Sequence, residues 1–267
     1  MSASDAAVAA EPLLLRSDKG GIATLTLNRP RQYNALSEEL LAALIEGLEG
    51  VEKDASVRVV VIAAAGSAFC AGHDLKQMRA TPSQDYYRRL FALCSKMMMT
   101  LTRIPQPVIA RVHGIATAAG CQLVAQCDLA VAADSARFAV SGINYGLFCS
   151  TPSVPLSRNV QRKPAMEMLL TGEFVDANTA KDYGLVNRVV PMDKLDAEIG
   201  VLASRIIEKS AVAVATGKRM FYKQLEMGLE AAYQYAAETM ACNMMAHDAG
   251  EGLDAFLEKR KPEWTHK

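Results

Sequence analysis

The 267-residue sequence lacks the short patterns that identify the commonest metal and cofactor sites. No two cysteines form a CxxC pair, no histidines stand in HxxxH or HExxH spacing, and no segment reads GxGxxG. Zinc sites and dinucleotide-binding folds depend on these patterns, so we expect neither a bound metal nor a nicotinamide cofactor. The six cysteines lie mostly within apolar runs, which predicts reduced and buried thiols.

An excess of charge and a long apolar run are also missing. The chain has 29 basic and 29 acidic residues, so nothing indicates a nucleic-acid or anionic membrane partner. No apolar run approaches the ~20 residues that span a bilayer. The opening segment MSASDAAVAAEP has neither arginine nor a basic stretch before an apolar one. We therefore expect no targeting peptide and a cytoplasmic protein.

The first half of the chain contains a repeated strand–strand–helix pattern. Alternating apolar residues predict a hairpin from residues 13–16 and 22–28, and Ser37 is expected to cap an amphipathic helix. Further strands are predicted at 57–63, 108–112, 128–133 and 136–140, and a helix at 83–104. This repeat favours an α/β fold with one coiled layer over a doubly wound sheet.

The second half is predominantly helical. The segment 141–155 is rich in Gly, Ser and Pro and is predicted to be a loop, and only the residues near Val186 resemble a strand. Helices are predicted at 163–170, 177–183, 192–208, 211–226, 231–245 and 252–260. We therefore divide the chain into a core of residues 1–159, which carries the site, and a helical region of residues 160–267, which serves oligomerisation.

Two loops of small side chains each follow a buried strand. One reads FCAGHDL, and the other lies within VIARVHGIATAAGCQL, from Val108 to Leu123. The second passes from a strand into a helix, and the first turn of a helix presents unpaired N–H groups at its positive end. Such a turn can hold an oxyanion, or it can be a tight strand–helix crossing packed with alanines. Both interpretations stand at this point.

The segments LNRPRQYNAL, FCAGHDLK, AAGCQLVAQCDLAVA, LLTGEFVDANTAKDYGLVNRVVP and FLEKRKP resemble the crotonase family, also called the enoyl-CoA hydratase/isomerase superfamily. The resemblance implies a ββα spiral with a helical region that forms a homotrimer or a dimer of trimers. It implies an acyl-CoA thioester as the substrate, with CoA as part of that substrate and no separate cofactor. By the same resemblance, the backbone N–H groups of His73 and Ala119 hold the thioester oxygen and stabilise the enolate, while the His73 imidazole lines the pocket.

The resemblance also indicates which residues contact CoA. The strip that contacts the adenine end, with its neighbouring lysine, matches Ala71, Asp74, Leu75 and Lys76. Phe256 and Lys259 match a C-terminal helix that reaches the CoA of a neighbouring subunit. For Lys259 an ordinary solvated helix end, where the dipole favours cations, is the other interpretation.

Two positions depart from the family pattern. Hydratases of this family use two glutamates to activate water and protonate the α-carbon, and these match Gln122 and Gly142. An amide orients water but exchanges no proton at neutral pH, and glycine has no side chain. We therefore expect hydration to be absent or very slow, and glutamate at both positions to raise it. Cys149 matches a pocket tyrosine of methylmalonyl-CoA decarboxylase and is expected in the pocket wall.

Three functions remain open. The first is an acyl-CoA lyase or isomerase that needs only the oxyanion hole, such as a decarboxylase of malonyl-type thioesters. Loss of two negative charges reduces the repulsion of a substrate carboxylate. The second is an enzyme that recruits an external base, such as bicarbonate, into the space at Gly142. The third is a non-catalytic acyl-CoA binder or an oligomeric scaffold.

Overall fold

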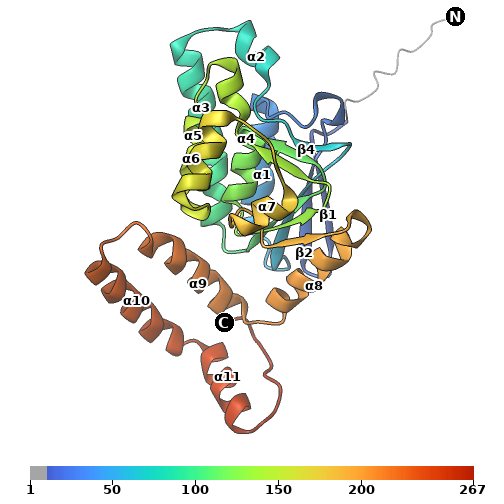
Figure 1. Ribbon diagram of the computed structural model, residues 1–267. Coiled ribbons are helices and arrows are strands. Elements are labelled where there is room, and N and C mark those ends of the chain that lie inside the picture. Colours follow the sequence, from blue (N-terminus) through green and yellow to red (C-terminus); the bar gives the residue numbers. More distant parts are fainter. Residues whose placement is uncertain (1–10) are drawn as a thin grey trace, which may run out of the picture.

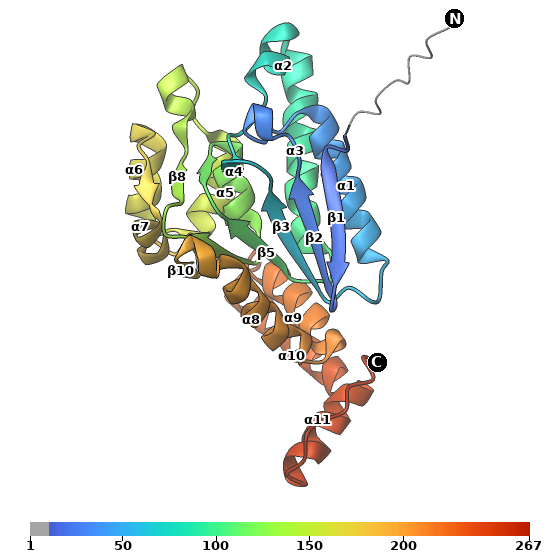
Figure 2. The ribbon, with the colours of Figure 1, turned by 90° about the vertical axis from the view of Figure 1, so that its right-hand side faces the viewer.

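The computed structural model describes residues 11–267, which form two sheets and the helices around them (Figures 1 and 2). The larger sheet has the strand order β1-β2-β3-β5-β7-β10. Its strands are β1 Leu14–Lys19, β2 Ile22–Leu27, β3 Val59–Ala64, β5 Val108–Val112, β7 Leu129–Ala133 and β10 Arg188–Val190. β1 and β2 form the predicted antiparallel hairpin, and the other pairings in this sheet are parallel.

The smaller sheet has the order β4-β6-β8-β9. Its strands are β4 Ala68–Cys70, β6 Ile115–Thr117, β8 Arg137–Ala139 and β9 Val175–Asp176. Along the chain, β3, β5 and β7 of the larger sheet are followed directly by β4, β6 and β8 of the smaller one. Each such pair then leads into helices, which confirms the predicted α/β fold with a ββα spiral core.

The helices account for most of the remaining described residues. They are α1 Glu38–Glu52, α2 Leu75–Ala80, α3 Gln84–Arg103, α4 Ala119–Gln126, α5 Ser150–Asn159, α6 Arg162–Thr171, α7 Ala177–Asp182, α8 Leu195–Ile207, α9 Ala211–Gln224, α10 Leu229–Met244 and α11 His247–Leu257. Short 3-10 turns are η1 Pro30–Gln32, η2 Ser141–Tyr145 and η3 Met192–Lys194. α1 begins as predicted, because the Ser37 hydroxyl accepts a hydrogen bond from the Leu40 N–H at 3.3 Å.

Helices cover both faces of the larger sheet, and β3 shows how the two faces are divided (Figure 2). Successive side chains of a strand point to opposite faces. Val60 and Ile62 lie in the cluster formed with α1 and α3, whereas Val59 and Val61 lie in the cluster formed with α8. Because all four side chains are buried, β3 is apolar throughout, as is usual for a strand covered on both faces.

Two features differ from the predicted pattern. The segment 141–155, predicted to be a loop, contains η2 and the start of α5. Pro152 is compatible with α5, because the first turn of a helix needs no backbone N–H donors. β9 lies where no strand was predicted, whereas β10 confirms the strand expected near Val186 and α8 lies within the helix predicted at 192–208. β9 and β10 complete the two sheets, and α8 covers one face of the larger sheet. The described helices that stand away from this body are α9, α10 and α11 (Figure 1).

A buried ion pair attaches α9 to the body. The Lys218 ammonium lies 2.6 Å from the Asp128 carboxylate and donates to the carbonyl oxygens of Leu101 at 2.7 Å and Gln106 at 2.8 Å. The Tyr222 hydroxyl donates to the other Asp128 oxygen at 2.7 Å. Every N–H of the ammonium is therefore used, and Asp128 is a structural residue.

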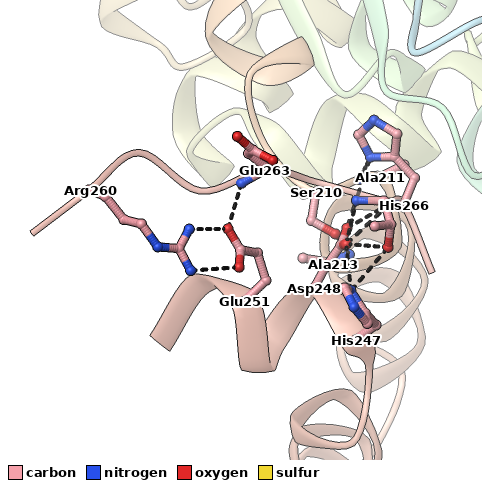
Figure 3. A network of polar contacts seen from close by, with 10 residues as sticks. Ser210, Ala211, Ala213, His247, Asp248, Glu251, Arg260, Glu263 and His266 are labelled. Atoms are coloured by element: carbon pink, nitrogen blue, oxygen red, sulfur yellow. Dashed lines mark hydrogen bonds and ion pairs between the residues drawn. The ribbon is translucent and has the colours of Figure 1, made fainter. Parts of the chain in front are cut away.

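The end of the chain returns along α11 to the start of α9 (Figure 3). The buried Asp248 carboxylate accepts hydrogen bonds from the backbone N–H groups of Thr265 at 2.8 Å and His266 at 3.0 Å. The Trp264 indole donates to the Glu208 carbonyl at 2.8 Å. Burial alone raises the pKa of Asp248, but hydrogen bonds from Ser210, Thr265 and His266 outweigh burial and lower this pKa.

Because the folded-state pKa of Asp248 is depressed, its contribution to stability is complete above the unfolded value of ~3.9. It is lost as the pH falls through the lower folded-state pKa. Trp264 is the single tryptophan, so its fluorescence reports on this contact directly. We expect its emission to shift to longer wavelength below about pH 4, before far-ultraviolet circular dichroism is lost. Asp248→Asn should show the shifted emission already at pH 7, and identical acid titrations of the two proteins would contradict the assignment.

Candidate functional site

The two small-residue loops are in direct contact. A Cβ on Gly120, in the first turn of α4, would overlap the carbonyl oxygen of Cys70 at the end of β4. A Cβ on Gly72 would lie 2.9 Å from the Ala118 Cβ and 3.4 Å from the Ala119 nitrogen. Both glycines are therefore required by close packing, and this packing brings the His73 backbone beside the start of α4.

The turn into α4 has an unusual backbone. Ala118 has φ 51° and ψ −119°, a left-handed conformation that residues with a Cβ rarely adopt. Hydrogen bonds on both sides hold it there: the Ala118 N–H donates to the Ala139 carbonyl at 3.0 Å, and the Ala118 carbonyl accepts from the Gln122 N–H at 3.0 Å. Backbone strain of this kind is most common at functional sites. Ala118 is the residue before the helix, so α4 begins at Ala119.

The N–H groups of His73 and Ala119 are both unpaired within residues 11–267. On either side of His73, the Gly72 carbonyl accepts from the Leu36 N–H at 2.7 Å, and the Asp74 N–H donates to the Leu36 carbonyl at 3.2 Å. His73 itself is left without a backbone bond to Leu36. Ala119 is only 1% exposed, and its N–H lies at the positive end of the α4 dipole. Two unpaired donors on neighbouring loops are the groups that an oxyanion would require.

The His73 side chain is partly buried, both of its ring nitrogens are inaccessible to solvent, and its lowered pKa keeps the ring neutral at pH 7. Burial lowers its pKa, and the nearby Leu36 carbonyl opposes this shift only in part. Its ring packs edge-on against Phe91 with centroids 5.5 Å apart. Neither ring nitrogen has a hydrogen-bond partner among the described residues.

Gln122 has a side-chain oxygen free to bind a ligand, whereas the space beside Gly142 is filled by neighbouring atoms. Gln122 is 4% exposed, and its Oε1 has no hydrogen-bond partner among the described residues. At Gly142 a Cβ would lie 2.6 Å from the Leu147 carbonyl oxygen and 2.7 Å from the Cys149 Sγ. The Gly142 N–H also donates to that sulfur at 3.2 Å. The expectation that glutamate at both positions raises hydration therefore needs correction, since the turn leaves no space for a side chain at 142.

The nearest carboxylates are already engaged. Asp74 caps α2 by accepting from the N–H groups of Lys76 at 3.1 Å and Gln77 at 3.2 Å, and it pairs with Arg29 at 2.9 Å. Asp128 is held by Lys218 and Tyr222. Neither group is free to exchange protons with a substrate. Residues 11–267 contain no group of three His, Cys, Asp or Glu side chains arranged to hold a metal, and within the same range no helix is long and apolar enough to cross a membrane.

The remaining predicted site residues fall into two separate places. Ala71 and Asp74 lie partly buried at the first loop, whereas Leu75 and Lys76 are exposed at the start of α2. Phe256, 81% exposed, and Lys259 lie at the end of α11, which Figure 1 places at the opposite end of the molecule from α2. Within one chain the structure therefore does not bring the second pair to the loops.

Sequence reasoning missed Leu36, Phe91 and Leu147 as neighbours of the site. Leu36 bonds to the first loop, Phe91 packs on the His73 ring, and the Leu147 carbonyl fills the space at Gly142. The contact of Leu147 depends on a turn at Gly146, where φ is +77°. A glycine there was the one available signal for that turn.

The clefts identified in the structure lie elsewhere. Cavities of about 340 and 360 Å³ open between α9, α10 and α11, lined by residues such as Tyr235 and Trp264. α10 has no buried residue, and its exposed apolar side chains include Leu229, Tyr233, Met240 and Met244. These openings are gaps beside uncovered helix faces rather than a site for the chemistry of the two loops.

The substitution Gly120→Ala tests the contact between the loops. The added methyl meets a backbone carbonyl that cannot move freely, so we expect a destabilisation of ~1–3 kcal/mol or more and at least a tenfold loss of acyl-CoA affinity. Gly200→Ala is the matched control, because nothing lies within 4 Å of a Cβ there. In a helix interior it should be neutral or stabilising by up to ~1 kcal/mol. Equal stability of the two variants in urea would show that the loops are not closely packed.

A sequence model described as enoyl-CoA hydratase/isomerase matches residues 17–267. The chain is 46% identical to enoyl-CoA hydratase domain-containing protein 3, mitochondrial, of Xenopus laevis, over 96% of this chain and 87% of that protein. A crystal structure of an enoyl-CoA hydratase from Mycobacterium smegmatis matches with a TM-score of 0.94 and 64% identity, over 95% of this chain and 99% of that one. Human enoyl-CoA hydratase domain-containing protein 3 matches with a TM-score of 0.92 and 43% identity, over 95% and 100%. The resemblance inferred from the sequence is confirmed.

The same relatives correct one expectation. Those from Xenopus laevis, Mus musculus and Homo sapiens are named mitochondrial, so the predicted cytoplasmic location is wrong. That prediction rested on the composition of the opening residues, of which 1–10 lie outside the described part of the chain.

Proposed function

This chain belongs to the enoyl-CoA hydratase/isomerase family, and we propose that it binds an acyl-CoA thioester and stabilises the enolate through the N–H groups of His73 and Ala119. The observation that carries the proposal is that both N–H groups are unpaired on two loops in direct contact. In the enolate, negative charge moves onto the thioester oxygen. Preorganised donors in a dry site contribute ~3–4 kcal/mol each to such a charge.

Hydration by a pair of carboxylates does not fit this site. Gln122 is an amide, and the space at Gly142 is filled by Leu147 and Cys149. Asp74 and Asp128 are held in ion pairs. General acid–base steps contribute ~10²–10⁴ in rate each, so a protein without them should hydrate an enoyl thioester very slowly. The reaction is instead one that needs charge stabilisation without a protein carboxylate.

Two of the remaining alternatives can be weighed. The close contacts at Gly142 count against an external base such as bicarbonate, because the space it needs is occupied. Decarboxylation of a malonyl-type thioester needs no base and remains compatible with the site. A non-catalytic acyl-CoA binder would use the same two N–H groups without turnover, so the choice between them depends on measurement.

The helices α10 and α11 support a homotrimer or a dimer of trimers. Large apolar side chains in this region are mostly exposed: Leu229 is 76% exposed, Tyr233 71%, Met245 86% and Phe256 81%. Monomeric proteins rarely expose large apolar patches to solvent. A second copy would cover these side chains and bring its Phe256 and Lys259 to the CoA of its neighbour. Since those two residues lie far from the loops of their own chain, assembly would complete the site.

Assembly is measured by light scattering. At micromolar concentration the wild-type protein should have the mass of three or six copies. Leu229→Arg combined with Tyr233→Arg should lower this mass, because two buried charges without partners are costly at an interface. Lys163→Arg on the exposed part of α6 is the control and should leave the mass unchanged. A wild-type monomer would contradict the proposed assembly.

Turnover is measured with a panel of acyl-CoA thioesters in deuterated buffer, followed by NMR at the α-carbon. We expect saturable binding and little or no hydration of crotonyl-CoA. Exchange at the α-carbon or release of carbon dioxide identifies an enzyme, and binding with neither identifies a binder. Hydration of crotonyl-CoA at ordinary enzyme rates would contradict the assignment of Gln122 and Gly142, and failure of every thioester to bind would contradict the proposed function itself.

A further inference from the structure

Two polar side chains beside the proposed oxyanion site, buried Gln122 and partly buried His73, have inaccessible atoms without a partner within residues 11–267. The Oε1 atom of Gln122 is fully buried without a hydrogen bond among the described residues, and so are both ring nitrogens of His73. A buried polar group without a partner is costly, and native proteins rarely retain one unless something else pairs with it. Unpaired atoms of this kind also occur at Tyr86, Gln106, His113 and Asn243, but Gln122 and His73 lie on different elements and both lie beside the proposed site.

The positions of these side chains relate them to the acyl group. His73 contributes one of the two N–H groups, so its side chain begins close to the proposed position of the thioester oxygen. Gln122 lies one turn after Ala119 on α4, so both are on the same side of that helix. A group that pairs with either side chain therefore lies within a few carbons of the thioester carbon. Apart from Phe91 against the His73 ring, neither side chain is held by a partner of its own.

We propose, resting on the proposed function, that Gln122 and His73 are specificity-determining residues that select a short acyl group carrying a hydroxyl. A hydroxyl both donates and accepts, so it pairs with either end of the Gln122 amide and with either nitrogen of a neutral imidazole. An unsubstituted alkyl chain leaves both groups unpaired. The acyl pocket of this chain is therefore polar where a plain fatty-acyl chain requires apolar walls.

Charge excludes a carboxylate as the preferred group. Among described cations, Lys218 is buried but paired with Asp128, and Arg29, beside the first loop, is paired with Asp74. Lys76 is exposed at the start of α2. A buried carboxylate next to Gln122 and a neutral His73 imidazole would have no counter-charge, so it should bind less tightly than a hydroxyl. A neutral hydroxyl needs none. A malonyl-type thioester could still bind and lose its carboxylate as carbon dioxide.

The test compares butyryl-CoA, 4-hydroxybutyryl-CoA, 3-hydroxybutyryl-CoA and succinyl-CoA by isothermal titration calorimetry on the wild-type assembly. At least one hydroxylated thioester should bind about tenfold more tightly than butyryl-CoA, a difference of ~1.4 kcal/mol. Succinyl-CoA should bind no better than butyryl-CoA. Equal affinity for butyryl-CoA and both hydroxylated thioesters overturns the inference, and so does preference for succinyl-CoA. Both results leave the proposed function intact, whereas absence of binding by all four contradicts the proposed function as well.

Gln122→Met keeps the size of the side chain and removes its amide. The preference for the hydroxylated thioester should fall to about twofold or less, and the thermal midpoint should not decrease, because no hydrogen bond within the protein is lost. Gln126→Met, one turn later on α4, is the matched control and should keep the full preference. A second variant, His73→Leu, should also reduce the preference, since the backbone N–H remains. Full preference in both Gln122→Met and His73→Leu, or a lowered midpoint in Gln122→Met with unchanged preference, would assign these residues a structural role only.

Discussion

The contact between Gly120 and the Cys70 carbonyl is the constraint on which the site depends. Any side chain at Gly120 would separate the start of α4 from the end of β4. With no Cβ there, the two loops touch, Ala118 adopts its left-handed conformation, and α4 begins at Ala119. The N–H groups of His73 and Ala119 are left without partners as a result of this packing. The small residues therefore form the tight crossing that one interpretation of the sequence predicted, and this packing is compatible with the other interpretation, a turn that holds an oxyanion.

The C-terminal helices are attached by polar contacts rather than by an apolar core. Lys218 and Asp128 connect α9 to the body, and Asp248 with Trp264 holds the end of the chain against α9 and α11. These contacts use few apolar side chains. The apolar residues of α10 and α11 consequently remain exposed in a single chain and available to other copies. The body contains both loops of the candidate site, and α10 and α11 expose large apolar side chains.

Periodicity predicted the long elements well and the short ones poorly. β2, α1 with its Ser37 cap, and β5 appear where the pattern indicated them, because burial on one or both faces leaves a strong signal over five or more residues. β1 is almost entirely exposed. β4 and β6 have only three residues each and could not be distinguished from loops. The segment 141–155 contains helical turns despite its glycines and prolines: Pro152 lies in the first turn of α5, where it is tolerated, but Pro155 lies inside the helix.

The chemistry of the site was predictable only in part. The residues at positions 73, 119, 122 and 142 could be singled out from motifs, and so could the absence of two glutamates. Their surroundings come from distant parts of the chain. Leu147 closes the space at Gly142, Phe91 packs on His73, and Arg29 pairs with Asp74. No local pattern encodes such contacts, since each joins elements that are adjacent only after folding.

The most direct test of the central claim is the infrared spectrum of a butyryl-CoA labelled with ¹³C at the thioester carbonyl, recorded free and bound. Two hydrogen bonds from His73 and Ala119 should polarise the carbonyl and move its stretching band to lower frequency. A bound ligand, saturated by calorimetry, whose band stays at or above the frequency of free butyryl-CoA in buffer would contradict the account.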